Sequence, residues 1–293
     1  MDAYLVSIGI VVFIYALLAI GLNLQYGETG LINFGHVAFF AIGAYTSALM
    51  ALNGVPLWLS FPAAGVAAAL AAVPLGMAAL RLREDYLAIV TLGFSESIRL
   101  AIQQEEWLTH GVQGIPGVPA LFASAGGSTR NLMQLASLVA CTGAAILAVR
   151  MLQQSPFGRL LRAIRDNEPA VTAIGKDPAG YKIRVFMLGA ALAGIAGAFY
   201  AHFVTFITPE QFVPLVTFYV WMSIILGGVG SMRGALLGTL ILVVFLEGSR
   251  FLRDLVPGIA ESQMAHVRLG VIGLALILCM LFQPQGIFGK RGQ

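Results

Sequence analysis

SPFGRLLRAIRDNEPAVTAIGKDPAGYKIR, residues 155–184, is the longest polar and charged interruption in a chain that is otherwise almost entirely apolar. The stretch contains six of the seventeen Lys and Arg residues and three of the fourteen Asp and Glu residues. Its net charge of +3 therefore equals the formal net charge of the whole chain. Because apolar runs of membrane-spanning length lie on both sides of it, we expect this stretch to be a loop outside a membrane.

The pattern inside the loop predicts two short amphipathic helices joined by a sharp corner. Ser155 is a good N-cap, and Pro156 suits the first position of a helix. Asn167 is expected to cap a second helix, Gly175 suits the left-handed residue that ends it, and Asp177 starts the next helix. Apolar residues recur at i, i+3, i+4 and i+7, which is the spacing of one helical face. The residues on this face are Phe157, Leu160, Leu161 and Ile164.

Two interpretations of the loop remain open from the residues alone. A basic amphipathic helix can rest on anionic lipid headgroups. A loop with two capped helices is more elaborate than a tether needs, which favours docking of a protein partner. In that case the apolar face, with Leu161 and Ile164 as its main contacts, is expected to bury against the partner.

The composition identifies the chain as a polytopic helical membrane protein. Of its 293 residues, 58% are hydrophobic and only 11% are charged, whereas about 25% charged residues is usual for a soluble domain. We expect one transmembrane domain, residues 1–293, that contains the loop. Cys141 and Cys279 lie in apolar runs, so they are interpreted as small buried residues and not as a disulfide. The first apolar run is too long for a signal peptide and is interpreted as a retained span.

The apolar runs predict an all-α bundle of about nine spans, within a range of eight to ten. Alternating the spans places the basic loop 155–184 and Lys290 on one side of the membrane, and Glu105 and Glu106 on the other. The positive-inside rule then makes the basic side cytoplasmic, with the N-terminus outside and the C-terminus inside. The predicted spans are 4–26, 36–52, 57–80, 86–103, 132–152, 183–206, 212–228, 234–252 and 267–283.

Two stretches fit a plain spanning helix poorly. Residues 27–45, GETGLINFGHVAFFAIGAY, mix glycines with Glu28, Asn33 and His36, and residues 218–239 contain GGVGSMRGALLG. Non-helical backbone at membrane depth is tolerated only where protein or water covers it, and interrupted helices point to a transport site. The alternative is that the glycines simply permit close helix packing, which is the preferred interpretation for the second stretch.

Polar residues inside the predicted spans are the candidates for a substrate path. Glu96 and Arg99 are three residues apart, so the pair either neutralises itself or leaves Glu96 to meet a substrate ammonium group. A lone histidine such as His36 is more often a satisfied interior residue than a substrate contact. The candidate path residues are Asn23, Tyr26, Asn33, His36, Tyr45, Thr91 and Glu96.

Several functions are excluded by motifs that the sequence lacks. It contains no G-x-x-x-x-G-K-[ST] motif, so this chain does not hydrolyse ATP itself. No cluster of Cys and His indicates a metal, and neither a cofactor nor a nucleic-acid partner is expected. Ser231 lacks the G-x-S-x-G context of a serine hydrolase, so we do not expect an enzyme.

The loop resembles the cytoplasmic coupling loop of ABC-importer permeases of the branched-chain amino-acid (LivM-like) family. GRLLRAIRDNE and the YK before the next span are close to the sequences of that family. Pro169 interrupts the general Glu-Ala-Ala motif of importers and Gly175 falls one place late, so the resemblance is to the subfamily. Other resembling blocks follow in order along the chain: LNLQYGETGLINFGHVAFFAIGAYT, DYLAIVTLGFSESIRL, GVQGIPGVP, ITPEQF, LGGVGSMRGALLG and FQPQGIFG.

This resemblance implies the permease subunit of an importer that moves branched-chain amino acids by ATP-driven alternating access. It implies a second related permease, two ATPase subunits, a periplasmic binding protein, an amino-acid substrate and the lipid of a bacterial inner membrane as partners. The residues implied to couple the loop to an ATPase are Phe157, Arg159, Leu160, Leu161, Arg162, Ile164, Arg165, Glu168 and Gly175.

Two alternatives stay open beside this assignment. A permease for urea or a short amide has subunits that resemble these. A secondary transporter or channel driven by an ion gradient usually has an unpaired membrane carboxylate at its coupling site. Glu96 and Glu247 each have an arginine three residues further on, which counts against that class.

Overall fold

The computed structural model describes residues 2–79, 82, 84–123, 125–255, 270, 273–274, 277, 281 and 286–287. Within these residues the chain is helical and forms no β-strand, which confirms the predicted all-α class. The elements in chain order are α1 (Asp2–Thr29), α2 (His36–Leu52), α3 (Leu57–Ala79), α4 (Glu84–Gln104), α5 (Glu106–Thr109), η1 (Gly111–Gln113), α6 (Gly127–Gln154), α7 (Pro156–Asp166), α8 (Glu168–Ala173), α9 (Pro178–Val204), η2 (Pro209–Phe212), α10 (Leu215–Gly227) and α11 (Met232–Leu255).

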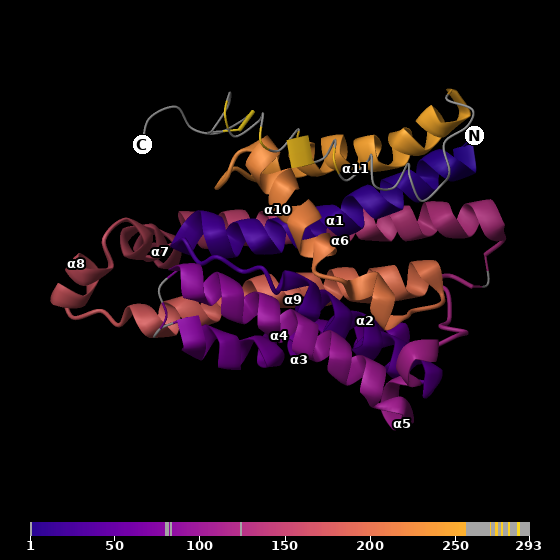
Figure 1. Cartoon of the computed structure of the whole chain (residues 1–293), viewed down its shortest axis with the longest axis horizontal. Helices are drawn as coiled ribbons and strands as arrows, with labels where there is room; N and C mark the ends of the chain where they lie inside the picture. Colours follow the sequence, from indigo (N-terminus) through magenta and orange to yellow (C-terminus); the bar gives the residue numbers. More distant parts are fainter. Residues whose placement is uncertain are drawn as a thin grey trace.

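The long helices run side by side along the long axis of the molecule (Figure 1). The loop helices α7 and α8 lie together at one end, which we call the loop end. The N-terminus and α5 lie at the opposite end, which we call the far end. Helix α9 packs against α1, α2 and α3 and so occupies the middle of the bundle.

Five stretches of the described chain are long and apolar enough to cross a membrane, so the prediction of about nine spans is not confirmed. Helix α2 has only 17 residues, and α10, with 13 residues, reaches spanning length only together with η2. Helix α4 carries four charged residues, Glu84, Asp85, Glu96 and Arg99. Most of the predicted span 267–283 lies outside the described residues. The five stretches are Tyr4–Thr29, Leu57–Ala78, Thr129–Gln154, Pro178–Val204 and Pro209–Gly227.

Glycines let neighbouring helices approach closely. A β-carbon added to Gly43 of α2 would overlap the backbone of Gly194 in α9. The same relation holds between Gly227 of α10 and Gly234 of α11. Helices in a bilayer associate through such tight contacts because lipid is as apolar as the helices themselves. The packing interpretation is therefore confirmed for Gly234 and Gly238, whereas Gly230 lies in the turn between α10 and α11 with a φ of +76°, a conformation that favours glycine.

The chain is interrupted before each of the two half-length helices. Helix α1 ends at Thr29, and residues 30–35 form non-helical backbone before α2 begins. Residues 205–214 carry only the short helix η2 before α10 begins. Figure 1 shows that α2 and α10 both begin about halfway along the molecule, away from either end. The first poorly fitting stretch, residues 27–45, is thus an interrupted helix, as the sequence indicates.

The loop 155–184 has the local structure that its sequence predicts. Ser155 and Asn167 cap α7 and α8 by accepting hydrogen bonds of 3.3 and 3.1 Å from backbone amides in the first turn of each helix. Asp177 caps α9 in the same way, at 3.0 Å. Gly175 follows α8 with a φ of +75°, a conformation that favours glycine.

The apolar face of α7 packs against the bundle. Leu161 and Ile164 are 0% and 2% exposed, and Leu161 shares a cluster with Leu24 of α1 and Val149 of α6. The expectation that Leu161 and Ile164 bury against a partner is therefore wrong, because helices of the same chain already cover them. The large apolar side chain that the loop exposes is instead Ile174, at the corner after α8, with 72% of its surface accessible.

Candidate functional site

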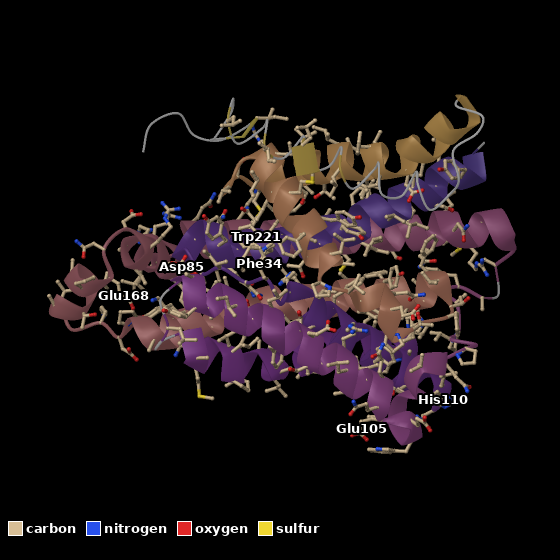
Figure 2. The ribbon with its side chains drawn as sticks, in the orientation of Figure 1. Phe34, Asp85, Glu105, His110, Glu168 and Trp221 are labelled. Carbon is tan, nitrogen blue, oxygen red and sulfur yellow. The ribbon has the colours of Figure 1, made fainter. Side chains whose placement is uncertain are left out.

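The first turns of the half-length helices α2 and α10 meet inside the molecule. The backbone N–H of Val37 donates to Oγ1 of Thr217 at 3.0 Å. The indole Nε1 of Trp221 donates to the backbone carbonyl of Asn33, also at 3.0 Å. Figure 2 shows Phe34 and Trp221 side by side near the centre of the molecule. We call this place, formed by residues 33–37 and 217–221, the half-helix junction.

Buried amide side chains hold the non-helical segment 30–35 in one conformation. Nε2 of Gln25 donates to the carbonyl of Phe186 at 2.9 Å, and Nδ2 of Asn33 donates to Oε1 of Gln25 at 2.9 Å. Oδ1 of Asn33 accepts from the N–H of Gly35 at 2.9 Å. Gln25 and Asn33 are fully buried, where an unpaired polar group is costly. The network therefore fixes the path of the segment to the junction.

The backbone N–H groups at the start of α2 already donate hydrogen bonds to acceptors within the chain. The N–H of Phe34 donates to Oγ1 of Thr91 at 3.0 Å, and the N–H groups of Gly35 and Val37 are bound by Asn33 and Thr217 as described above. Open helix N-termini bind anions through such amides when they are free. Here the amides of Phe34 and Val37 bind α4 and α10, and that of Gly35 binds within the segment, so the polar part of the junction is structural.

An aromatic cluster covers the junction and reaches the surface of the molecule. The ring centroids of Tyr26 and Trp221 lie 4.8 Å apart, and the ring of Phe34 lies 5.2 Å from Phe218 and 5.3 Å from Trp221. Phe218 is 42% exposed. These four residues form the aromatic cluster, which offers an apolar surface to an aliphatic side chain. Sequence reasoning identified Tyr26 but missed the other three, because no local motif links them.

Three of the predicted path residues lie away from this surface. His36 is fully buried beside Gly21 of α1, and neither of its ring nitrogens has a hydrogen-bond partner among the described residues. Oδ1 of Asn23 accepts from the N–H of Gly230 at 2.8 Å, which ties α1 to the turn before α11. Tyr45 is buried in the core. His36 is thus an interior residue, as expected, but within the described part of the chain its ring nitrogens lack the hydrogen bonds that a satisfied histidine would have.

Glu96 forms a salt bridge with Arg99 of the same helix, α4. Nε of Arg99 donates to Oε2 of Glu96 at 2.9 Å, and the second guanidinium nitrogen contacts Oε1. The two residues are three positions apart on α4. This geometry is the self-neutralising pair that the spacing allows.

The predicted coupling residues divide into two groups. One group is buried or half-buried against the bundle, and the other lies on the open side of the loop. The first group is Phe157, Leu160, Leu161, Arg162, Ile164 and Arg165. The second group is Arg159, Glu168 and Gly175.

An open pocket of about 890 Å³ lies at the loop end, where the end of α1, the start of α4 and the loop helices meet. Its charged lining is Asp85, Arg165, Glu168 and Lys182, and Figure 2 shows Asp85 and Glu168 at this end. Glu168 and Lys182 neutralise each other at 2.6 Å. No group of His, Cys, Asp and Glu in the described part of the chain could hold a metal ion.

Comparison with known proteins points to one family. A family model described as branched-chain amino acid transport system / permease component matches residues 4–280. The chain is 33% identical to the high-affinity branched-chain amino acid transport system permease protein LivM of Escherichia coli K12, over 96% of this chain and 69% of that protein. It is 26% identical to the probable branched-chain amino acid transport permease protein LivM of Methanocaldococcus jannaschii, over 95% of this chain and 91% of that protein. It is 27% identical to the high-affinity branched-chain amino acid transport system permease protein LivH of Salmonella typhimurium, over 94% of this chain and 91% of that protein. No solved structure matches the chain significantly.

Proposed function

Because this chain belongs to the family of branched-chain amino acid transport permeases, we propose that it is the membrane-spanning permease subunit of an ABC importer for branched-chain amino acids. The observation that carries the proposal is the family match over residues 4–280. The proposed mechanism is alternating access, in which ATPase partners move the loop 155–184 and the helices reorient around the substrate passage.

The proposed assembly contains this chain, a second related permease, two ATPase subunits and a periplasmic binding protein. We place it in a bacterial inner membrane, with the loop end in the cytoplasm and the N-terminus in the periplasm. The six Lys and Arg residues of the loop support this orientation, because cytoplasmic loops carry an excess of basic residues. Figure 2 shows Glu105 at the far end, on the opposite side of the molecule from Glu168.

We place the substrate passage along the half-helix junction. Helices interrupted near the middle of a bundle are the usual sites of substrate binding in transporters. The aromatic cluster lies at such an interruption, and its partly exposed Phe218 offers an apolar contact to the side chain of leucine, isoleucine or valine. Of the residues predicted from sequence, Asn33 belongs to this junction, Tyr26 belongs to the aromatic cluster that covers it, and Thr91 accepts a hydrogen bond from the N–H of Phe34.

We place the ATPase contact at the corner formed by α8 and Gly175. Figure 1 shows α8 projecting beyond the ends of the long helices. The exposed Ile174 supplies an apolar anchor there, and Arg159 and Glu168 remain accessible beside it. Buried apolar anchors usually dominate the binding energy of such an interface. This contact replaces the one first expected at Leu161 and Ile164.

Uptake of radiolabelled leucine tests the proposal. Cells that lack their own uptake system would express the complete transporter, and uptake is expected to require the ATPase subunits. Phe218→Ala is expected to lower uptake about tenfold, which corresponds to about 1.4 kcal/mol of lost contact. The matched control is Phe245→Ala on α11, because Phe245 is 38% exposed and Phe218 is 42% exposed.

The outcomes of this assay separate the alternatives. Equal uptake by the Phe218→Ala and Phe245→Ala variants would remove the aromatic cluster from the passage. ATPase-dependent uptake of radiolabelled urea, with no uptake of radiolabelled leucine, would favour the urea or short-amide permease. Leucine uptake that continues without the ATPase subunits and collapses with the ion gradient would favour a secondary transporter.

A further inference from the structure

The loop end of α1 carries a charge of the wrong sign for a helix C-terminus. The last carbonyl groups of a helix form the negative end of its dipole, where a cation is stabilising and a carboxylate is not. The last turn of α1 contains Glu28 and no basic residue. The side chain of Glu28 is only 7% exposed, so water does not solvate this carboxylate. Another part of the chain must therefore supply the compensating donors.

Helix α7 and the end of α6 supply these donors. Nη1 of Arg162 lies 3.2 Å from Oε2 of Glu28, and Nε2 of Gln153 donates to Oε1 of Glu28 at 2.8 Å. Nη1 of Arg165 donates to the backbone carbonyl of Gly27 at 2.7 Å. Arg165 therefore adds a cation at the C-terminal end of α1, which Gly30 closes by donating its N–H to the carbonyl of Tyr26 at 2.9 Å, while Arg162 pairs with the Glu28 side chain. We call Glu28, Arg162, Arg165 and the carbonyl of Gly27 the polar joint.

The polar joint and the apolar face of α7 hold the same two helices together. Leu161, on α7, packs with Ile20 and Leu24 of α1, one to two turns before Glu28. Helix α7 is thus attached to α1 through apolar contacts along the helix and through charged contacts at its end. A displacement of α7 then moves the end of α1 with it.

The residues directly after the polar joint lead to the half-helix junction. Gly30 has a φ of +73° and turns the chain out of α1. Asn33, five residues after Glu28, accepts the hydrogen bond from Trp221, and Phe34 belongs to the aromatic cluster. At the end of this segment, the side chain of Asn33 is bound to Gln25 of α1 by a hydrogen bond of 2.9 Å, which links the junction back to α1.

A second charged contact also links the loop to the bundle. Glu168 of α8 pairs with Lys182 of α9 at 2.6 Å, and each of the two pairs has one exposed partner, because the side chain of Glu168 is 46% exposed and that of Arg162 is 41% exposed. The carboxylate of Glu28 differs in that it is itself buried and also accepts from Gln153, so it depends strongly on its donors. The Glu28 contact therefore joins α1, α6 and α7, whereas the Glu168 contact joins α8 to α9.

We propose that the polar joint transmits the movement of the loop 155–184 to the half-helix junction, with Arg162, Arg165 and Glu28 as positioning residues. The proposal rests on the proposed function, because it assigns the route by which ATPase movement reaches the substrate passage. The joint couples two sites, so breaking it changes the uptake obtained per ATP and leaves ATPase docking at α8 intact.

The test uses the complete transporter in liposomes and measures ATP hydrolysis and amino-acid uptake together. Arg162→Met removes the charge and keeps an aliphatic side chain. It is expected to retain ATP hydrolysis and stoichiometric ATPase subunits while uptake per ATP falls about tenfold, a usual size for coupling between two sites. Arg162→Lys keeps the charge and is expected to restore most of the uptake. Glu28→Gln, which keeps the shape of the side chain, is the second variant and is expected to behave like Arg162→Met.

The matched control is Arg150→Met, which removes an exposed arginine from the last turns of α6 at the same end of the molecule. It is expected to leave uptake per ATP unchanged. A loss in the control equal to that of Arg162→Met would show that any lost charge at the loop end has this effect, which would overturn the proposal.

A second measurement distinguishes two roles of the polar joint: transmitting the movement of the loop to the half-helix junction, and merely holding α7 in place. With 5-fluorotryptophan in the complex, the fluorine signal that disappears on Trp221→Phe identifies Trp221. Addition of ATP is expected to shift this signal in the wild type and in Arg150→Met, and not in Arg162→Met or Glu28→Gln. A shift of wild-type size in both joint variants, with wild-type uptake per ATP, would overturn the proposal. Failure of the proposed function is distinguishable, because the wild-type complex itself would then show no ATP-dependent uptake.

Discussion

The indole nitrogen of Trp221 donates a hydrogen bond of 3.0 Å to the backbone carbonyl of Asn33, although 188 positions separate the two residues. Asn33 lies in the non-helical segment before α2, and Trp221 lies on α10. This one contact therefore joins the two interrupted parts of the chain. It also brings Phe34 against Phe218 and Trp221 and so completes the aromatic cluster.

Trp221→Phe is expected to destabilise the permease and to lower uptake. The ring is kept, but the buried carbonyl of Asn33 loses its donor, which costs about 1–3 kcal/mol. A lower melting temperature of the purified complex in detergent is the expected result. Trp58→Phe is the control, because Trp58 is exposed on α3. Identical melting temperatures for the two variants would contradict the importance of this bond.

Leu161→Ala is expected to destabilise the fold itself and not only the contact with an ATPase. A fully buried leucine reduced to alanine costs about 2–5 kcal/mol, and Leu161 is covered by α1 and α6. Ile174→Ala, at the exposed corner, is expected to leave the melting temperature unchanged and to weaken co-purification of the ATPase subunits. The reverse pattern would return the ATPase contact to the apolar face of α7.

Gly43→Ala is expected to separate α2 from α9. The added methyl group would overlap the backbone of Gly194, and overpacking of this kind costs about 1–3 kcal/mol or more. Gly93→Ala is the control, because a β-carbon on Gly93 of α4 meets nothing within 4 Å. The yield of monodisperse protein and its melting temperature measure the effect. Equal values for both variants would mean that α2 and α9 do not rely on this contact.

Single-cysteine labelling is expected to establish the orientation in the membrane. In a variant without Cys141 and Cys279, a cysteine at Asp177 in the loop should react with a membrane-impermeant reagent only after the cells are opened. A cysteine at Trp107, on the exposed far end, should react in intact cells. Labelling of position 177 from outside intact cells would reverse the proposed orientation.

The sequence by itself determined the features that depend on neighbouring residues. The caps Ser155, Asn167 and Asp177 and the turn at Gly175 follow from local hydrogen bonding and backbone freedom, so they could be predicted and are present. The apolar composition likewise determined the helical class, because a backbone in lipid must satisfy its own hydrogen bonds. The blocks of family resemblance needed no structure either.

Only the tertiary structure decided which residues meet. Helical periodicity shows that Leu161 and Ile164 share a face, but it does not show whether α1 or a partner covers that face. The junction of Asn33 with Trp221 and the joint of Glu28 with Arg162 each connect residues more than 130 positions apart. Such contacts depend on how whole helices pack, and packing is set by shape along the entire helix, for which a single sequence holds no local signal.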